Sequence, residues 1–186
     1  MGGVGADISA IEIVERRSDG HVIDDFILTM PPGTLAETII NACADMPDVK
    51  VLWLSRYPDQ WNLESDIEVI NRMSKQRGRS AQILTEDAPT VFRCEWAALI
   101  DRQRLVVLHA TERAPEFTAD QLRALGDLSQ ASRHLMGEGW MPDWGEVTVA
   151  SAPIDDERTL LVGRQGGPEF LDSELLRLEH LASVAR

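Results

Sequence analysis

The side chains that could do chemistry in this chain are histidines, cysteines and carboxylates, and their spacing does not assemble them into a site. No two histidines stand at a metal-ligand spacing from each other or from a cysteine, so we expect solvent-facing histidines. Asp24 and Asp25 fall in an expected strand, where neighbours point to opposite faces and cannot act on one substrate. Asp155 and Asp156 fall in an expected hairpin turn, where aspartate is favoured by the backbone geometry. The histidines are His21, His109, His134 and His180.

Motifs for nucleophilic or nucleotide chemistry are also missing from the sequence. There is no nucleophile elbow or phosphate-binding loop, and the opening Met1-Gly-Gly-Val-Gly-Ala6 does not fit G-x-G-x-x-G. We expect Cys43 and Cys94 to be reduced and buried, as in a cytoplasmic protein, although a disulfide between them stays open. An enzyme using Cys94 or His109 would need neighbours such as Arg93 to depress the thiol pKa. The sequence therefore predicts no enzyme, no metal and no cofactor.

The overall charge restricts the partners. Eighteen Lys and Arg against 31 Asp and Glu give a formal charge of −13 over 186 residues. Nucleic acid and anionic membrane surfaces both attract cationic proteins, so neither is an expected partner. No apolar run is long enough to span a bilayer, which again favours a cytoplasmic protein.

The first part of the chain predicts the order strand, strand, helix, strand. Strands are expected at 6–15 and 22–30, and a third over the apolar run 49–55. Thr34-Leu-Ala-Glu37 has the form of a capping box that would begin a helix at Thr34. Tyr57–Asn62 is the expected domain boundary, which gives domains at 1–58 and 63–186.

The second part predicts helices around an antiparallel sheet, an α+β layout. Helices are expected at 63–75, from Ser80 to Pro89, from a capping box at Thr118 to Leu135, and from a cap at Asp172. Their expected buried stripes are Ile67, Ile70 and Met73 in the first; Leu122, Leu125, Leu128, Ala131 and Leu135 in the third; and Leu175, Leu178, Leu181, Ala182 and Ala185 in the last. Strands are expected at 94–100, 105–111, 146–153 and 159–164.

The first part resembles an ACT domain, a ferredoxin-like βαββαβ module that senses ligands. Gly5-Ala-Asp-Ile-Ser-Ala-Ile-Glu-Ile-Val-Glu15 is similar to the turn into that family's second strand, and 24–28 and 51–54 to its third and fourth strands. The resemblance implies a truncated module whose first strand, glycine-bearing loop and first helix lie upstream of Met1. A degenerate domain, or a partner chain filling the gap, are the alternatives. It also implies that Asp7 and Ile8 lie near an amino-acid site, often at a dimer interface.

The second part resembles a GAF domain, a small-molecule-sensing α/β module. The matching segments are Val149–Pro153, Thr159–Pro168 and Phe170–Ala182, where a strand ends near a glycine-rich turn before a leucine-striped helix. Aromatic and basic side chains could line its pocket and hold an acidic or planar ligand. Alternatively, Trp96 packs in the core and the Trp140–Trp144 loop covers it. The candidate pocket residues are Trp96, His109, Arg113, Trp140 and Trp144.

Together the two resemblances predict a non-enzymatic regulatory or sensory protein. It would bind a small ligand, in the first place an amino acid, and form a homodimer through sheet edges and the helices at 63–75 and 172–185. The alternative is a protein–protein docking module with no small ligand. An exposed apolar patch with a charged rim would favour that alternative.

Overall fold

The computed structural model describes residues 4–52, 54, 64–141, 144–165 and 169–186 of the chain. It divides into two compact units, Met1–Arg56 and Tyr57–Arg186, which are described separately. Its fold class is α+β: the described residues form helices, a two-stranded sheet and a five-stranded sheet, with both sheets antiparallel. This confirms the predicted class and the antiparallel arrangement. Among the described residues, no helix is both long and apolar enough to cross a membrane.

Unit 1 is a hairpin with one helix. Strands β1 (Asp7–Arg16) and β2 (Val22–Thr29) pair antiparallel, and the turn between them includes Gly20 with a positive φ of 90°. Helix α1 spans Ala36–Ala44. It begins later than expected because Leu35 is its N-cap; the Thr34 hydroxyl instead donates to the Pro31 carbonyl oxygen at 2.7 Å.

The third strand expected in unit 1, over 49–55, is not formed. Residues 49–52 and 54 are described and are not in a strand, whereas 53 and 55 lie outside the described residues. A strand needs a neighbour for its backbone hydrogen bonds, and β1 and β2, the strands described in this unit, pair only with each other. The apolar run alone was therefore not sufficient to form a strand in the described part of this segment.

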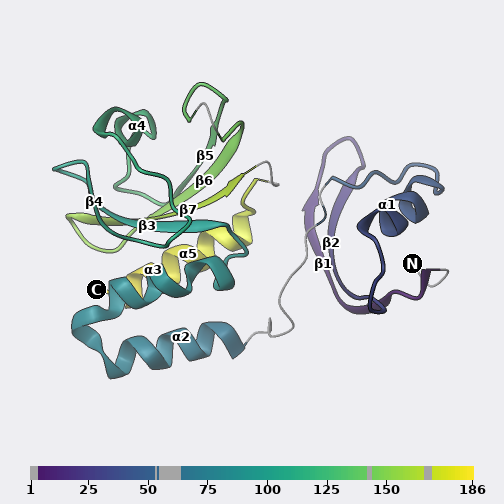
Figure 1. Ribbon diagram of the computed structural model, residues 1–186, viewed down its shortest axis with the longest axis horizontal. Helices are drawn as coiled ribbons and strands as arrows, with labels where there is room; N and C mark the ends of the chain where they lie inside the picture. Colours follow the sequence, from purple (N-terminus) through teal and green to yellow (C-terminus); the bar gives the residue numbers. More distant parts are fainter. Residues whose placement is uncertain (1–3, 53, 55–63, 142–143, 166–168) are drawn as a thin grey trace. The chain divides into compact units, whose positions relative to one another are not determined.

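Unit 2 is built on the five-stranded sheet. Its strands are β3 (Trp96–Asp101), β4 (Val106–Ala110), β5 (Ser132–Met136), β6 (Val147–Pro153) and β7 (Arg158–Gln165). Their spatial order is β4-β3-β7-β6-β5, with every neighbouring pair antiparallel (Figure 1). Both faces of the three central strands are buried, which explains why β3, β6 and β7 lack the polar alternation of a half-exposed strand.

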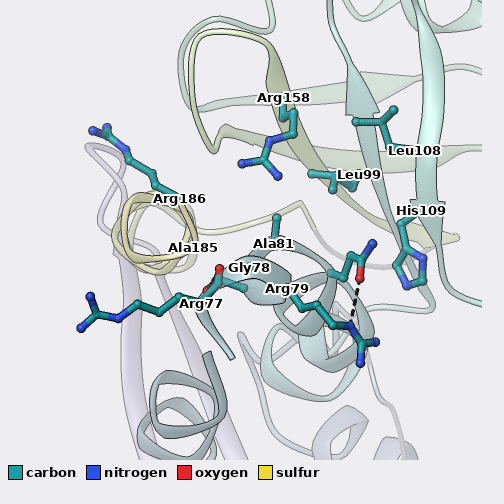
Figure 2. A pocket seen from close by; sticks show the side chains of 12 residues that line it. Arg77, Gly78, Arg79, Ala81, Leu99, Leu108, His109, Arg158, Ala185 and Arg186 are labelled. Atoms are coloured by element: carbon teal, nitrogen blue, oxygen red, sulfur yellow. Dashed lines mark hydrogen bonds between the residues drawn. The ribbon is translucent and has the colours of Figure 1, made fainter. Parts of the chain in front are cut away.

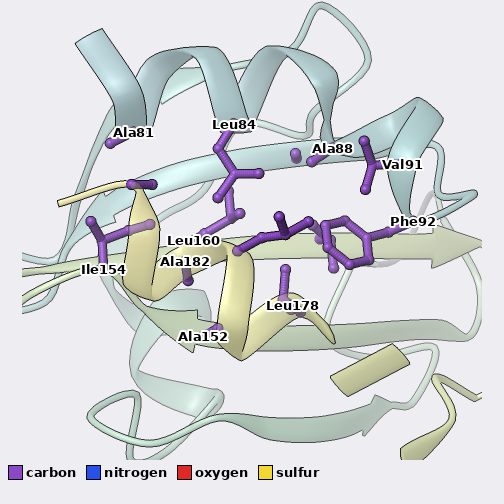
Figure 3. Packing of buried hydrophobic residues seen from close by; sticks show 14 of the residues in the cluster. Ala81, Leu84, Ala88, Val91, Phe92, Ala152, Ile154, Leu160, Leu178 and Ala182 are labelled. Atoms are coloured by element: carbon purple, nitrogen blue, oxygen red, sulfur yellow. The ribbon is translucent and has the colours of Figure 1, made fainter. Parts of the chain in front are cut away.

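Helices α3 (Ser80–Val91) and α5 (Asp172–Val184) cover one face of this sheet, and α2 (Glu64–Lys75) packs against these two helices. Figure 3 shows α3 and α5 meeting the sheet through small and branched side chains such as Ala88, Leu160 and Ala182, all fully buried. The stripe predicted for α5 is confirmed at Leu178, Leu181, Ala182 and Ala185, with Leu175 packed against the cluster.

Three details of these helices differ from prediction. In α2 the predicted stripe is confirmed at Met73, whereas Ile67 and Ile70 are exposed and Val69 is buried instead. Helix α3 continues past Pro89 to Val91, because proline disturbs only the last turn there. The N-cap of α5 is Leu171 and not Asp172: the Glu174 carboxylate accepts the Leu171 N–H at 2.9 Å.

The opposite face of the sheet is covered by α4 (Ala119–Ala124) and the segments beside it. The predicted capping box of Thr118 and Gln121 is formed. The long helix predicted beyond it was wrong: α4 has six residues, and Gly126 follows with a φ of 77°. The Asp127 carboxylate then accepts the Ser129 N–H at 2.8 Å, and the chain enters β5, where Leu135 is exposed.

Candidate functional site

The tryptophans predicted to line a pocket belong to a packed core. Trp96 is fully buried; its ring packs edge-on against Phe117 at 5.4 Å between centroids, and Phe117 lies 6.0 Å from the Trp140 ring. The Trp140 indole N–H donates to the Gln121 carbonyl oxygen at 2.9 Å. Trp144 is half-buried against the same cluster. This arrangement is the alternative raised from the sequence, in which the loop covers Trp96.

His109 and Arg113 are not brought to that cluster. His109 lies on β4 toward α3, on the other face of the sheet, with its Nε2 3.3 Å from a Glu86 carboxylate oxygen. Arg113 is exposed after β4. The five residues therefore do not line one cavity.

Asp7 and Ile8 lie at the start of β1, opposite Thr29 and Leu28. Both are exposed. They belong to unit 1, whereas the two cavities described next belong to unit 2. The predicted amino-acid site at these residues stays a prediction.

A cavity of about 320 Å³ lies between the start of α3 and strands β3 and β4 (Figure 2). We call it the arginine cavity. Its apolar wall includes Ala81, Leu99 and Leu108, and polar side chains surround the mouth. Those polar side chains are Arg77, Arg79, Gln82, His109, Arg158 and Arg186.

Two short, well-bonded turns position the arginines. The first is the 3₁₀ turn η2 (Arg77–Arg79) before α3, where the Ser80 hydroxyl donates to the Arg77 carbonyl oxygen at 2.9 Å and the Arg79 N–H to that of Gln76 at 2.8 Å. The second is the β6–β7 turn, where the Asp155 carboxylate accepts the Arg158 N–H at 2.7 Å.

The electrostatics of the arginine cavity differ from one arginine to the next. Arg158 forms an ion pair with Asp155 at 2.6 Å; burial opposes ionisation of Asp155, but hydrogen bonds from Arg158 and Glu157 outweigh it and lower its pKa. Arg79 donates to the Gln82 amide oxygen at 3.1 Å and lies 3.6 Å from Glu86. Arg77 has no ion-pair partner among the described residues. Sequence reasoning treated Gln76–Arg79 only as a helix break; two arginines around a glycine before a helix were the available signal.

A second cavity, of about 350 Å³, lies between α2 and α5. Its charged groups satisfy each other: Arg177 donates to both Asp66 oxygens at 2.6 Å and to the Val91 carbonyl oxygen at 2.7 Å. Ile70 and Leu176 contribute an apolar lining. A ligand in this cavity would therefore meet mainly apolar side chains, because Arg177 and Asp66 neutralise each other.

Cys94 was the sequence's candidate nucleophile, and its surroundings hold it as a thiol. Both cysteines are buried and free. Burial raises the pKa of Cys94 to about 12, against a smaller opposing effect from Arg164. Its Sγ lies 3.4 Å from the Trp96 carbonyl oxygen. A thiol with this pKa is almost entirely protonated at neutral pH and is a poor nucleophile. Among the described residues, no three His, Cys, Asp or Glu side chains gather as a metal site would require.

In comparisons with known proteins, no protein-family model matches this sequence, and no curated protein matches it.

Proposed function

We propose that this chain is a regulatory protein without catalytic activity that senses a small ligand. The observation that carries the proposal is the arginine cavity. It combines an apolar wall at Leu99 with hydrogen-bond donors at its mouth, and its volume of about 320 Å³ lies at the lower end of the range for small-molecule sites. The fixed sheet and the bonded η2 turn hold this geometry in place.

An amino acid is the first ligand class to test, because unit 1 resembles an ACT domain at Asp7 and Ile8 and in its β1–β2 hairpin. The second unit resembles a GAF domain, and its antiparallel sheet flanked by helices is compatible with that resemblance. On this proposal the chain reports ligand binding to a partner and catalyses nothing itself.

Ligand-dependent stabilisation of the whole chain tests the proposal. We would measure thermal unfolding with millimolar amino acids, organic acids and nucleotides. A ligand at about a hundred times its Kd stabilises the folded state by roughly 2.7 kcal/mol, which moves the midpoint by several degrees. Hydrogen exchange would then locate the ligand: slower exchange over 77–82 and 106–110 places it in the arginine cavity. A panel with no shift would contradict the sensor function.

A docking module without a small ligand is the second candidate, and unit 1 favours it. Large apolar side chains are exposed there, among them Ile11, Ile13 and Leu35. Several large apolar side chains exposed together mark interaction surfaces in soluble proteins. Crosslinking of the whole chain to a protein partner through unit 1, with no response to any small molecule, would support docking over sensing.

A further inference from the structure

We infer that the arginine cavity takes a small polyanion, such as a phosphate compound or a polycarboxylic acid, in preference to a zwitterionic amino acid. The inference rests on the proposed function and names the ligand class of the same site. It starts from the charge of the lining: the cavity has arginines and a histidine but no Asp or Glu side chain. The chain as a whole carries 31 acidic and 18 basic residues, so a lining with only basic charges runs against its composition.

Part of the positive charge of the lining is left for a ligand after its ion pairs with the protein are counted. Arg79 and Arg158 each have one acidic partner, Glu86 and Asp155, neither of which lines the cavity. Arg77 adds a positive charge that has no ion pair among the described residues. Each guanidinium has five N–H donors, so those not used by Glu86, Gln82 or Asp155 remain available to oxygen atoms.

The arginine side chains reach the mouth of the cavity from both of its sides. In Figure 2, Arg158 reaches over the cavity from the sheet side, whereas Arg79 lies on the α3 side with its bond to Gln82. Arg77 extends outward from the rim and is exposed, so it can rotate toward a bound anion without breaking an ion pair. Guanidinium groups form bidentate, charge-assisted hydrogen bonds with carboxylates and phosphates, which are stronger than neutral ones.

An ammonium group has no equivalent partner in this cavity. The acceptors along the lining are neutral: the Gln82 amide oxygen, which accepts from Arg79, and the Ser80 hydroxyl, whose one proton is shared between the Arg77 and Met73 carbonyl oxygens. The ammonium of an amino acid would therefore lie beside arginines with no carboxylate lining the site. Like charges in one site oppose binding, so the lining discriminates against zwitterions by repulsion as well as by missing contacts.

Calorimetric titration of the whole chain at constant ionic strength tests this inference. The probes are citrate, inorganic phosphate, glycine and glutamine, with sodium chloride adjusting the salt because exposed charges are screened. We expect citrate or phosphate to bind and both amino acids to bind at least about tenfold more weakly at this site. Tighter binding of phosphate or of citrate identifies the source of the anion, and either result supports the inference.

Two sets of variants locate the binding. Arg77→Gln with Arg79→Gln should raise the Kd for the bound anion by at least about tenfold, since two charge-assisted contacts are lost. The matched control, Arg104→Gln with Arg123→Gln, removes the same charge from two exposed arginines outside the cavity and should change the Kd by less than about twofold. If the double variant does not fold, Arg77→Glu alone replaces it, because that exposed side chain has no hydrogen bond or ion pair among the described residues.

Three outcomes overturn the inference. Equal weakening in the cavity and control variants means that the anion responds only to overall charge. Tighter binding of glutamine than of citrate, still lost in the Arg77 variant, refutes the ligand class while the sensor function stands. If no probe binds and no compound in the unfolding panel shifts the midpoint, both the ligand class and the sensor function fail.

Discussion

At the residue scale, the packing of unit 2 depends on a glycine opposite a tryptophan. Gly163 on β7 is the register partner of Trp96 on β3. A Cβ atom at position 163 would lie 2.0 Å from Cζ2 of the Trp96 ring, far inside van der Waals contact. The ring is fully buried and its indole N–H has no hydrogen-bond partner among the described residues, so it is held in place by shape alone. Glycine is needed here for space and not for backbone conformation.

We expect Gly163→Ala to destabilise unit 2 by about 1–3 kcal/mol, because the Trp96 ring must move within a filled core. Urea unfolding followed by tryptophan fluorescence measures the change. Gly139→Ala is the matched control, since a Cβ there meets nothing within 4 Å. Trp96→Leu replaces the ring with a smaller side chain, so adding Gly163→Ala to that variant should lower the free energy of unfolding by less than it does in the parent chain. An unchanged cost in that background would show that the clash is not the cause.

His134 on β5 makes the stability dependent on pH. Burial disfavours its charged form and lowers its pKa below the ordinary value of 6.5. The Ser132 hydroxyl lies 2.9 Å from its Nε2. As the pH falls through 6.5, the unfolded chain takes up a proton that the folded His134 does not, so stability is full above this pH and declines below it.

We therefore expect His134→Gln to lose less stability than the parent chain between pH 7.5 and 5.0. Urea unfolding at a series of pH values measures the difference. His180→Gln, which changes an exposed histidine on α5, is the control. A parallel pH profile for the parent and His134→Gln would rule out this histidine as the cause.

At the element scale, one buried ion pair connects β7, α5 and the end of α3. Arg164 is 4% exposed and bonds Glu174 at 2.5 Å, and it also donates to the Phe92 carbonyl oxygen at 2.8 Å. Its guanidinium lies 4.1 Å from the centroid of the Phe170 ring. Glu174 in turn accepts the Leu171 N–H that begins α5. The Glu174 carboxylate thus accepts a hydrogen bond at the start of α5 and also joins α5 to the sheet through Arg164.

Glu174→Ala should destabilise unit 2 by about 3–5 kcal/mol, because it removes the carboxylate partner of a buried guanidinium and the acceptor at the helix start. Chemical unfolding measures the loss. Asp120→Ala removes the partner of Arg123 in an exposed pair on α4 and should cost much less. Comparable losses in the two variants would mean that burial does not set the strength of the Arg164 pair.

The elements also show which parts of the fold could be predicted from sequence. Strands with turns between them, such as β3–β4 and β6–β7, were predicted correctly because short apolar runs and turn residues are local signals. The helix predicted from Thr118 to Leu135 was half wrong. Leucines at a spacing of three continued past Gly126, but pairing with β6, which is distant in sequence, decides the conformation of β5. A pattern of neighbouring residues cannot show that pairing with a distant strand will outweigh a local preference for helix.

The candidate site was harder to predict for a related reason. His109, Trp96 and the other aromatic residues were grouped by side-chain chemistry, but the sheet separates His109 from Trp96. The sequence did not show on which face of the sheet each side chain lies. Two residues on neighbouring strands share a cavity only if their register places them on one face. Arg77 and Arg158 reach one cavity from positions far apart in the chain, which only the tertiary fold reveals.

At the scale of the whole molecule, the two units differ in how much apolar surface they bury. Unit 2 has two continuous clusters, one on each face of its sheet. Among the described side chains of unit 1, only Ile39 and Cys43 are buried. Ile11 is 57% exposed and Ile13 is 52% exposed. Ile11, Ile13 and Phe26, the register partner of Ile11, lie on one face of the hairpin. A two-stranded hairpin with such a face is marginal in water unless something covers it.

We propose that a second copy of the chain covers this face, so that the protein is a homodimer. Light scattering at micromolar concentration should give twice the mass of the chain, and Ile11→Asp with Ile13→Asp should give the monomer, because a buried carboxylate without a partner strongly opposes association.

Val106→Asp, at an exposed apolar position on β4, and Leu176→Asp, on α5, are the controls. The Val106 variant should remain dimeric. Dissociation by Leu176→Asp instead would place the dimer interface on α2 and α5, and a parent chain that is already a monomer would leave the apolar face of unit 1 to a different protein.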